Sequence, residues 1–296
     1  MSPWRYGDGN PHPKQVALLG VVMLDRMKAG QKMDNLVRNL GRLDSLLVAF
    51  SGGVDSTFLL AVAHEILSEK VVAVTASSVI HAPRETKLAR AFTRERGIHH
   101  IIFPSEEIIL PDFVSNGPDR CYHCKRYLLE NFSKIAVEQG LNHMAHGANL
   151  DDLDDYRPGF RAAEEAGVIA PLIDAQLTKE EIRHLSREMG LPTWNKPPMP
   201  CLASRIPYGS PVTVEKLGMI QQAEAFLIEL GFTEFRVRHH GSVARIETDN
   251  AGFKNLMDDG IRESIVNKFR MIGFNHIALD LEGYVLGSLN RTLSNI

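Results

Sequence analysis

Short apolar runs alternate along the chain with longer segments that have the spacing of helices. The bulky runs at residues 46–50 and 71–77 have the composition of strands that are buried on both faces. Further strands are predicted at residues 99–103, 142–148 and 168–173, and helices at residues 57–67, 84–96 and 125–139. Because strands that alternate with helices form a parallel sheet, the pattern predicts a doubly wound α/β domain. Such domains bind ligands beyond the carboxyl ends of their strands.

A second, smaller α+β domain is predicted after a proline-rich stretch. Thr178 and Glu181 form a capping box, and the helix that they start ends at Gly190. Six prolines between Leu191 and Pro211 then indicate a linker or an ordered loop. The elements predicted beyond it are a helix at 214–230, a hairpin around His240 and Gly241, helical segments at 250–271 and a strand at 276–281. The predicted divisions are an N-terminal extension (1–30), the α/β domain (31–200) and the C-terminal α+β domain (201–296).

Composition narrows the class of protein. A chain of 296 residues with 44% hydrophobic content can bury one large core and a smaller one. No apolar run approaches the roughly 18 residues of a membrane span. The formal charge of -3 gives no reason to expect a nucleic-acid surface, so a small-molecule substrate fits better. Three cysteines are too few for a disulfide scaffold, which indicates thiols kept for chemistry in a reducing compartment, by default the cytoplasm.

The stretch SGGVDS, residues 51–56, stands between the first predicted strand and the first helix. Glycines in such a turn let the backbone approach a ligand closely, and the helix start offers unpaired N–H groups to a phosphate. The stretch lacks the lysine of a Walker A motif. It is similar to the loop of the PP-loop pyrophosphatases, which split ATP into AMP and pyrophosphate. The alternative is an ordinary turn in which Asp55 and Ser56 cap the helix.

The three cysteines are predicted to lie in loop-like places. Cys121 and Cys124 form a C-x-x-C pair at the start of a helix, and Cys201 follows the prolines. The pair is compatible with a zinc half-site, a redox dithiol or two ligands of an iron–sulfur cluster. Three cysteines could ligate three irons of a [4Fe–4S] cluster, and the fourth iron could then bind an exogenous sulfide.

Five motifs in the same order resemble the LarE family of ATP-dependent sulfur transferases, which build the nickel-pincer nucleotide cofactor. They are SGGVDS, DRCYHCK, HGANLDD, PCLASRIPYG and LDLEGYVLGSLN, and they extend from about Leu46 to Asn290. The resemblance implies that residues 31–200 form a PP-loop ATP-binding domain. It also implies an enzyme that adenylates the carboxylates of pyridinium-3,5-biscarboxylic acid mononucleotide and replaces an oxygen of each with sulfur. A homo-oligomer, such as a trimer of dimers, is expected from the family.

The family has two forms, which differ at the thiols. In one, a single cysteine that matches Cys201 gives up its own sulfur. In the other, three cysteines that match Cys121, Cys124 and Cys201 bind a [4Fe–4S] cluster and work with added sulfide. This chain has all three cysteines and resembles the cluster form. The alternative is that Cys121 and Cys124 are spectators and Cys201 is sacrificial.

The resemblance also assigns roles to residues around these motifs. Loop hydroxyls and amides would stabilise the departing pyrophosphate, with Mg²⁺ held in part by Asp55. The expected ATP-binding residues are Ser51, Gly52, Gly53, Asp55, Ser56, Asn149 and Asp152. The expected catalytic residues are Cys201, Asp55, Lys125 and Arg205. Asn149, Asp151 and Asp152 would equally suit a local turn and N-cap cluster.

Most of the charged residues near the cysteines and in the last domain have two possible interpretations. Lys125 and Arg120 would neutralise phosphate or lower a thiol pKa, or else be solvated surface charges. Arg205 is a reasonable clamp for a carboxylate or phosphate. Arg236 and Arg238 alternate along a predicted strand and project from one face, which suits a substrate phosphate or a solvated sheet face. His99, His100, His239 and His240 are expected at the surface or at strand edges rather than on a metal.

Two other functions compete with a sulfur transferase that acts on a small nucleotide. A PP-loop tRNA thiolase also pairs the loop with a C-x-x-C and a later cysteine, but the net charge of -3 gives no grip on a polyanion. A nucleotide-sensing module would bind ATP without turnover, and there the cysteines would have no purpose.

Overall fold

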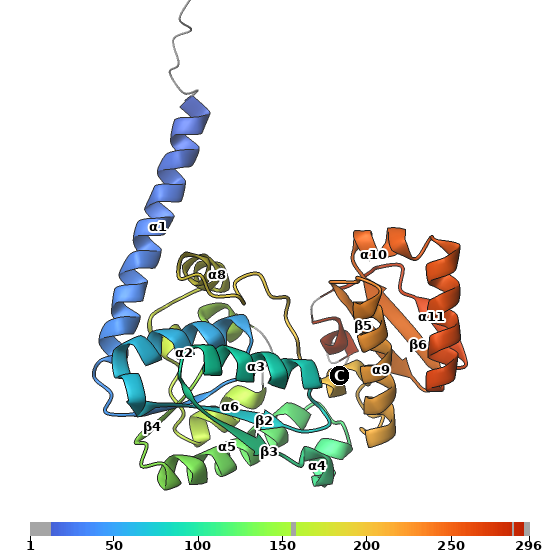
Figure 1. Ribbon diagram of the computed structural model, residues 1–296, viewed down its shortest axis with the longest axis horizontal. Coiled ribbons are helices and arrows are strands. Elements are labelled where there is room, and N and C mark those ends of the chain that lie inside the picture. The colour runs from blue at the N-terminus through green and yellow to red at the C-terminus, as the bar shows by residue number, and fades with distance from the viewer. Residues whose placement is uncertain (1–12, 155–157, 286, 293–296) are drawn as a thin grey trace, which may run out of the picture.

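The computed structural model describes residues 13–154, 158–285 and 287–292 and places them in two domains joined by the proline-rich linker (Figure 1). The first domain contains a four-stranded parallel sheet in the order β3-β2-β1-β4. Its strands are β1 (Leu46–Ala49), β2 (Val71–Ser77), β3 (His99–Pro104) and β4 (His143–His146). Ala49 at the end of β1 pairs with Val74 on one side and with His146 on the other. The carboxyl ends of the central strands therefore meet at one edge.

Helices cover both faces of this sheet because its central strands are apolar on both faces. On one face Leu46 and Val48 pack against α2 and α8, and on the other Leu47 packs against α5. Figure 1 shows α2 and α3 on one side of the sheet and α5 and α6 on the other. The helices of this domain are α1 (Pro13–Leu40), α2 (Val54–Leu67), α3 (Pro83–Glu95), α4 (Pro111–Val114), α5 (Arg120–Glu138), α6 (Pro158–Glu165), α7 (Pro171–Asp174) and α8 (Lys179–Glu188). The predicted doubly wound α/β class is confirmed.

The C-terminal domain has a mixed sheet of three strands with its own core. Strand β6 (Val243–Thr248) lies between β5 (Phe235–His240), which is antiparallel to it, and β7 (His276–Leu279), which is parallel. Helices α9 (Val214–Glu229), α10 (Asn250–Asn255) and α11 (Asp259–Ile272) complete the domain. Its core includes Leu227, Val237, Ile246 and Phe269, none of which is more than 2% exposed.

One predicted strand is wrong. Residues 168–173 contribute a single bridge, between Ile169 and Ala145 of β4, and the chain then turns into α7. The reason is Pro171, which has no N–H for a strand ladder and whose fixed φ suits the first turn of a helix. The apolar residues that suggested a strand are buried all the same, and Leu172 is fully covered.

Helix α1 is anchored to the first domain at its C-terminal end. Leu36 and Leu40 are buried in the core, and Lys32 Nζ donates to Glu181 Oε1 of α8 at 2.7 Å. Figure 1 shows the N-terminal part of α1 extending away from the sheet. Within the described ranges, no helix is both long enough and apolar enough to span a membrane.

The close approach of α10 to β6 predicts a strong effect of substitution at Gly252. A Cβ built there would lie 1.9 Å from Thr248 Oγ1 and 3.0 Å from Phe232 Cδ1. We expect Gly252→Ala to lower the free energy of unfolding by about 3 kcal/mol, because the backbone must shift to relieve the overlap. Urea unfolding followed by circular dichroism measures the change.

Gly218→Ala is the matched control, because Gly218 lies in α9 with open space around its Cα. There the substitution should raise stability by about 0.5–1 kcal/mol. Equal effects at the two positions would contradict the packing described here.

Candidate active site

The turn between β1 and α2, together with the first residues of that helix (51–56), is here called the phosphate turn. It exposes backbone N–H groups. Gly52 has a φ of +69°, a conformation that suits glycine, and Gly53 is the N-cap of α2 without a side-chain hydrogen bond. The hydroxyls of Ser51 and Ser56 lie 2.9 Å apart across the turn. Asp55 and Ser56 lie inside the first turn of α2, so the reading of them as helix caps is wrong. The helix start is left to a ligand such as a phosphate.

The loop after β4 presses directly against this turn. A Cβ built at Gly147 would lie 2.7 Å from Ser56 N and 3.1 Å from the carbonyl carbon of Asp55. Only glycine fits there without moving the start of α2. Gly147 belongs to the motif HGANLDD, but its role comes from a contact between distant segments and was not recognised from the sequence.

The polar residues of that motif form a turn cluster at the same edge of the sheet. Asn149 is buried; its N–H donates to Asp152 Oδ2 at 3.0 Å, and its Oδ1 accepts from Asp151 N at 3.0 Å. Asp151 also accepts from the N–H of Lys179, the first residue of α8, at 2.7 Å. These contacts are those of the local turn and N-cap cluster that the sequence offered as the alternative. They hold the motif beside the phosphate turn.

Two lysines that were not expected at the site contact the phosphate turn. Lys179 forms an ion pair with Asp55 Oδ2. Lys196, from the linker, donates to the carbonyl of Gly52 at 2.8 Å and to Glu85 Oε2 of α3 at 2.5 Å. Both come from segments remote in sequence, so no local pattern pointed to them.

The three cysteines come together between α5 and the linker. Helix α5 begins at Arg120, so Cys121 and Cys124 lie in its first turns, at the start of a helix as predicted but within it rather than in the loop before it. Cys201 does lie in the linker, immediately before a short 3₁₀ turn. Burial raises the pKa of Cys124 well above its ordinary value, and the nearby charges of Cys201, Glu107 and Cys121 raise it further. Cys124 and Cys201 pack against the same small core, and Cys121 lies on α5 three residues before Cys124, so the three thiols belong to one region of the structure.

The surroundings of the thiols are apolar on one side. Cys124 and Cys201 pack against a small core of their own. Its buried members are Ile80, Phe113, Leu202, Ala203, Ile206, Val212, Leu217 and Ile220. The N–H of Leu202 donates to the carbonyl of Ile80 at 2.8 Å, which fixes the chain just after Cys201.

Arg120 and Asn116 hold the segment that follows Cys201. Buried Asn116 donates to the carbonyls of Pro207 and Ser210, each at 2.8 Å, and accepts from Arg120. Arg120 Nη1 also donates to the carbonyl of Ala203 at 3.0 Å. Burial alone would lower the pKa of Arg120, but the negative charges of Cys201 and Cys121 outweigh it and raise that pKa. Arg120 is therefore a cation placed among the thiols, not a solvated charge.

Two basic residues lie near the start of α5 and at the end of β4: Lys125, which follows Cys124, and His146. Burial lowers the pKa of Lys125, against the effect of the Cys124 charge. Burial also lowers the pKa of His146 to about 4, with a smaller contribution from the charge of Lys125. The ring of His146 packs on Phe160 of α6 at 5.8 Å between centroids. At neutral pH, His146 is thus an uncharged imidazole at the end of β4.

Arg205 is fully buried and bonded within the protein. Its Nε and Nη2 donate to the two carboxylate oxygens of Glu224 at 2.9 and 3.1 Å. Its Nη1 donates to the carbonyls of Pro200 at 2.7 Å and Cys201 at 3.2 Å. These contacts make Arg205 a support for the backbone of the Cys201 segment.

Arg236 and Arg238 project from one face of β5, as the alternation predicts, and that face is turned toward the linker. Both are more than 90% buried, so the solvated-face reading is wrong. Arg238 forms a bidentate pair with Glu247 at 2.9 and 2.8 Å and donates to the carbonyl of Ser204 at 2.8 Å. Arg236 donates to the carbonyl of Pro198 and to the hydroxyl of Tyr284. Their guanidinium groups therefore gather around the segment that carries Cys201.

Two histidines are more enclosed than the sequence suggested. His239 is 5% exposed and packs on Phe274 with ring centroids 5.4 Å apart. His100 lies between the hydroxyls of Thr75 and Thr93, at 2.8 and 2.9 Å. Both are packing residues. Among the described residues, no group of three or more His, Cys, Asp or Glu side chains is placed to hold a single metal ion.

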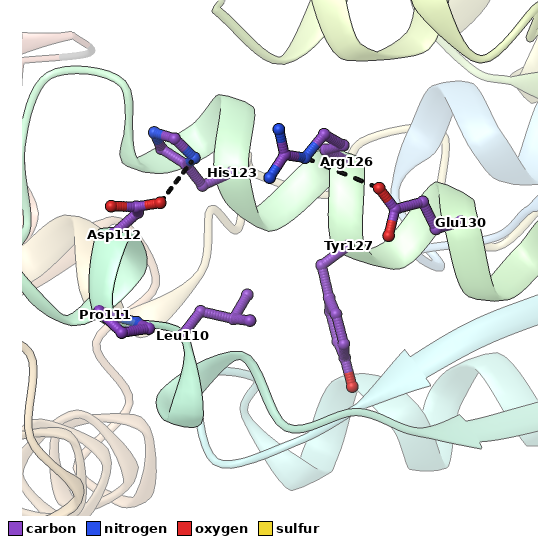
Figure 2. Close-up of a pocket in the computed structure, with 7 residues that line it drawn as sticks. All are labelled: Leu110, Pro111, Asp112, His123, Arg126, Tyr127 and Glu130. Atoms are coloured by element: carbon purple, nitrogen blue, oxygen red, sulfur yellow. Dashed lines mark ion pairs between the residues drawn. The ribbon is translucent and has the colours of Figure 1, made fainter.

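A pocket lies between α5 and residues 110–112 at the start of α4. Figure 2 shows that His123, Arg126, Tyr127 and Glu130 of α5 line it together with Leu110, Pro111 and Asp112. His123 Nδ1 lies 3.4 Å from Asp112 Oδ2 here, and Arg126 Nε lies 3.7 Å from Glu130 Oε1. None of the expected site residues lines this pocket.

Comparison with known proteins agrees with the fold and the phosphate turn. Residues 26–103 match the PP-loop domain family. The fold and the site thus define an ATP-using enzyme of the PP-loop class. The chain is also 24% identical over 197 residues, which cover 62% of each chain, to one subunit of the glutamine-hydrolyzing GMP synthase of Pyrococcus furiosus.

Longer matches narrow the class. The chain is 33% identical over 265 residues to the pyridinium-3,5-bisthiocarboxylic acid mononucleotide synthase of Lactiplantibacillus plantarum, covering 89% of this chain and 95% of that one. It is 42% identical over 263 residues to an uncharacterised protein of Synechocystis, covering 89% and 98%. The chain belongs to the LarE family, and it is an ATP-dependent sulfurtransferase.

The contact of Gly147 with the phosphate turn predicts a defect in ATP binding. In Gly147→Ala the new methyl group must displace Ser56 N and with it the N–H groups at the start of α2. We expect the Kd for ATP to rise at least about tenfold, which corresponds to about 1.4 kcal/mol. Isothermal calorimetry measures it. Gly30→Ala, in α1 with open space around it, is the control and should leave the Kd unchanged.

Burial of neutral His146 predicts a pH dependence of stability. Since its pKa is lowered to about 4 in the folded protein, the unfolded chain takes up a proton first as the pH falls below about 6.5. Stability should then fall by about 2 kcal/mol between pH 7 and pH 5 through this group. Urea unfolding of His146→Gln should lack this part of the pH dependence. The exposed His276→Gln serves as the control, and identical pH profiles for the wild type and His146→Gln would contradict the assignment.

Proposed function

We propose that this chain adenylates the carboxylates of pyridinium-3,5-biscarboxylic acid mononucleotide and converts them to thiocarboxylates. The relative from Lactiplantibacillus plantarum, which is named as the synthase of the bisthiocarboxylic acid product, matches over nearly its whole length. The observation that carries the proposal is that one linker holds both Lys196, which contacts the phosphate turn, and Cys201, which packs beside Cys124 on the same small core. A thiol centre beside an ATP site suits sulfur transfer to an activated acid.

Adenylation requires a place for the departing pyrophosphate. A carboxylate oxygen of the substrate attacks the α-phosphorus of ATP, and the bond to pyrophosphate breaks. The N–H groups at the start of α2 and the hydroxyls of Ser51 and Ser56 face this turn and would stabilise the charge that leaves. Lys179 and Lys196 add two cations at the same place.

The site fits Mg²⁺ at Asp55. One carboxylate oxygen of Asp55 pairs with Lys179, and the other, Oδ1, is buried without a partner among the described residues. A buried carboxylate oxygen is a ligand that Mg²⁺ prefers. Mg²⁺ bound there would neutralise charge on the phosphates.

The donor set fits a [4Fe–4S] cluster held by Cys121, Cys124 and Cys201. Cys124 and Cys201 pack against one apolar core, Cys121 lies exposed on the same helix as Cys124, and buried Arg120 offsets the negative charge that thiolates bring. A cluster with three thiolate ligands supplies one iron that is open to an exogenous sulfide. The chain's own part is to hold the acyl-adenylate so that the sulfur can displace AMP from the carbonyl carbon. Lys125, beside Cys124, is placed to balance charge there.

The iron content of protein purified without oxygen tests the proposal. We expect about four irons per chain, with the absorption of a cluster, and sulfide-dependent turnover. Cys121→Ser and Cys124→Ser should each lose most of the iron, because each removes one of three ligands. Calorimetry should find ATP binding unchanged in both variants, which excludes loss of the fold as the cause.

The sacrificial alternative gives the opposite result. Iron-free protein would make the thiocarboxylate once, and mass spectrometry would show that Cys201 has lost the mass of H₂S. Cys121→Ser would then keep its single turnover. That outcome would retain the sulfurtransferase and overturn the cluster.

A further inference from the structure

The segment from Trp194 to Leu202, here called the linker strap, connects the phosphate turn to Cys201. Its first part is fixed to α8, because Arg183 donates to the carbonyl of Trp194 at 2.8 Å and to that of Lys196 at 2.9 Å. The ring of Trp194 also packs under Arg187, 5.0 Å from the guanidinium carbon. The strap therefore starts from a firm anchor on the first domain.

Lys196 is the point where the strap contacts the ATP site. Its ammonium donates to the carbonyl of Gly52 and to the carboxylate of Glu85. The side chains of Lys196 and Glu85 are enclosed, with 15% and 19% exposure. A Cβ at Gly52 would meet Ala89 of α3 at 3.4 Å, so α3 covers the same glycine. The phosphate turn is thus enclosed between α3 and the strap, with the cation of Lys196 at the junction.

Beyond Lys196 the strap is short and held at several points. Arg236 donates to the carbonyl of Pro198, and Arg205 donates to those of Pro200 and Cys201. The chain from Lys196 to Cys201 reaches at most about 17 Å when fully extended. The contact of Lys196 with the phosphate turn is therefore separated from Cys201 by only a short stretch of chain whose backbone is held by arginines.

We propose that Lys196 is a positioning residue that couples occupation of the phosphate turn by a triphosphate to the placement of Cys201. A triphosphate brings several negative charges next to Gly52, and these attract the ammonium of Lys196 away from Glu85. The strap follows Lys196, so the thiol centre is set in position when ATP is bound. This inference rests on the proposed function for its use in sulfur transfer.

Lys179 provides an internal comparison. It also pairs with a residue of the phosphate turn, Asp55, but it belongs to α8 and not to the strap. Loss of its charge should weaken ATP binding without separating ATP use from sulfur transfer. Lys32, whose ion pair with Glu181 of α8 is similarly enclosed at 25% and 20% exposure, belongs to α1 and not to the strap and is the matched control.

Trp194 allows the coupling to be seen directly. The chain has two tryptophans, so in a Trp4→Phe background the emission comes from the strap alone. Titration with Mg²⁺ and a non-hydrolysable ATP analogue should change the emission of Trp194 in this background. Lys196→Met should abolish the change while calorimetry still detects binding, Lys196→Arg should restore part of it, and Lys32→Met should retain it in full.

The possible outcomes distinguish a failure of the proposed coupling from a failure of the proposed function. If the parent does not bind the analogue, the proposed function fails. If it binds but Trp194 does not respond, or responds equally in Lys196→Met, the coupling is overturned.

Turnover gives a second, independent readout. In Lys196→Met the thiocarboxylate formed per pyrophosphate released should fall about tenfold, because adenylation proceeds without correct placement of the thiol centre. In Lys179→Met, thiocarboxylate formation and pyrophosphate release should fall by the same factor. An unchanged ratio in Lys196→Met would overturn the inference.

Discussion

The segment that carries Cys201 is held by buried cations rather than by a sheet or a helix. Residues 196–201 belong to no regular element, yet Arg205 and Arg236 donate to their carbonyls and Arg183 to that of Lys196. Arg205 is fixed in turn by its own pair with Glu224. A buried guanidinium that loses its acceptors is costly, so the linker is confined to one path. The relation between the ATP site and the thiols depends on this path.

This arrangement explains why a proline-rich linker suits the reaction. Prolines restrict the chain before Cys201 and lack the N–H that a helix or a sheet would need, and the carbonyls of Pro198 and Pro200 accept from the surrounding arginines instead. The phosphate turn belongs to the domain with the parallel sheet, whereas Arg236 and Arg238 belong to β5 of the second domain. The linker strap lies between them and contacts both. Sulfur transfer to an adenylated acid needs these two chemistries within reach of one substrate.

The elements with strong local patterns could be predicted from the sequence. The apolar run before SGGVDS and the capping box of Thr178 and Glu181 both appear in the structure. The strand expected at 168–173 is wrong because burial alone does not distinguish a strand from a covered turn, and Pro171 decides in favour of a short helix. The part of the site that sequence reasoning missed depends on contacts between distant segments. Gly147 is required because the loop after β4 touches Ser56, and Lys179 and Lys196 lie 124 and 144 residues from their partners Asp55 and Gly52.

Transfer of a heavy oxygen isotope from the substrate tests the central claim most directly. If the carboxylate is adenylated and sulfur then displaces AMP, the carboxylate oxygen that attacked the phosphorus leaves with the AMP. Substrate labelled in its carboxylate oxygens must then release one AMP for each sulfur introduced, and each of these AMP molecules must carry one labelled oxygen. Mass spectrometry of the released AMP measures this. Unlabelled AMP together with a thiocarboxylate product would contradict the account, because the sulfur would then have entered without an acyl-adenylate.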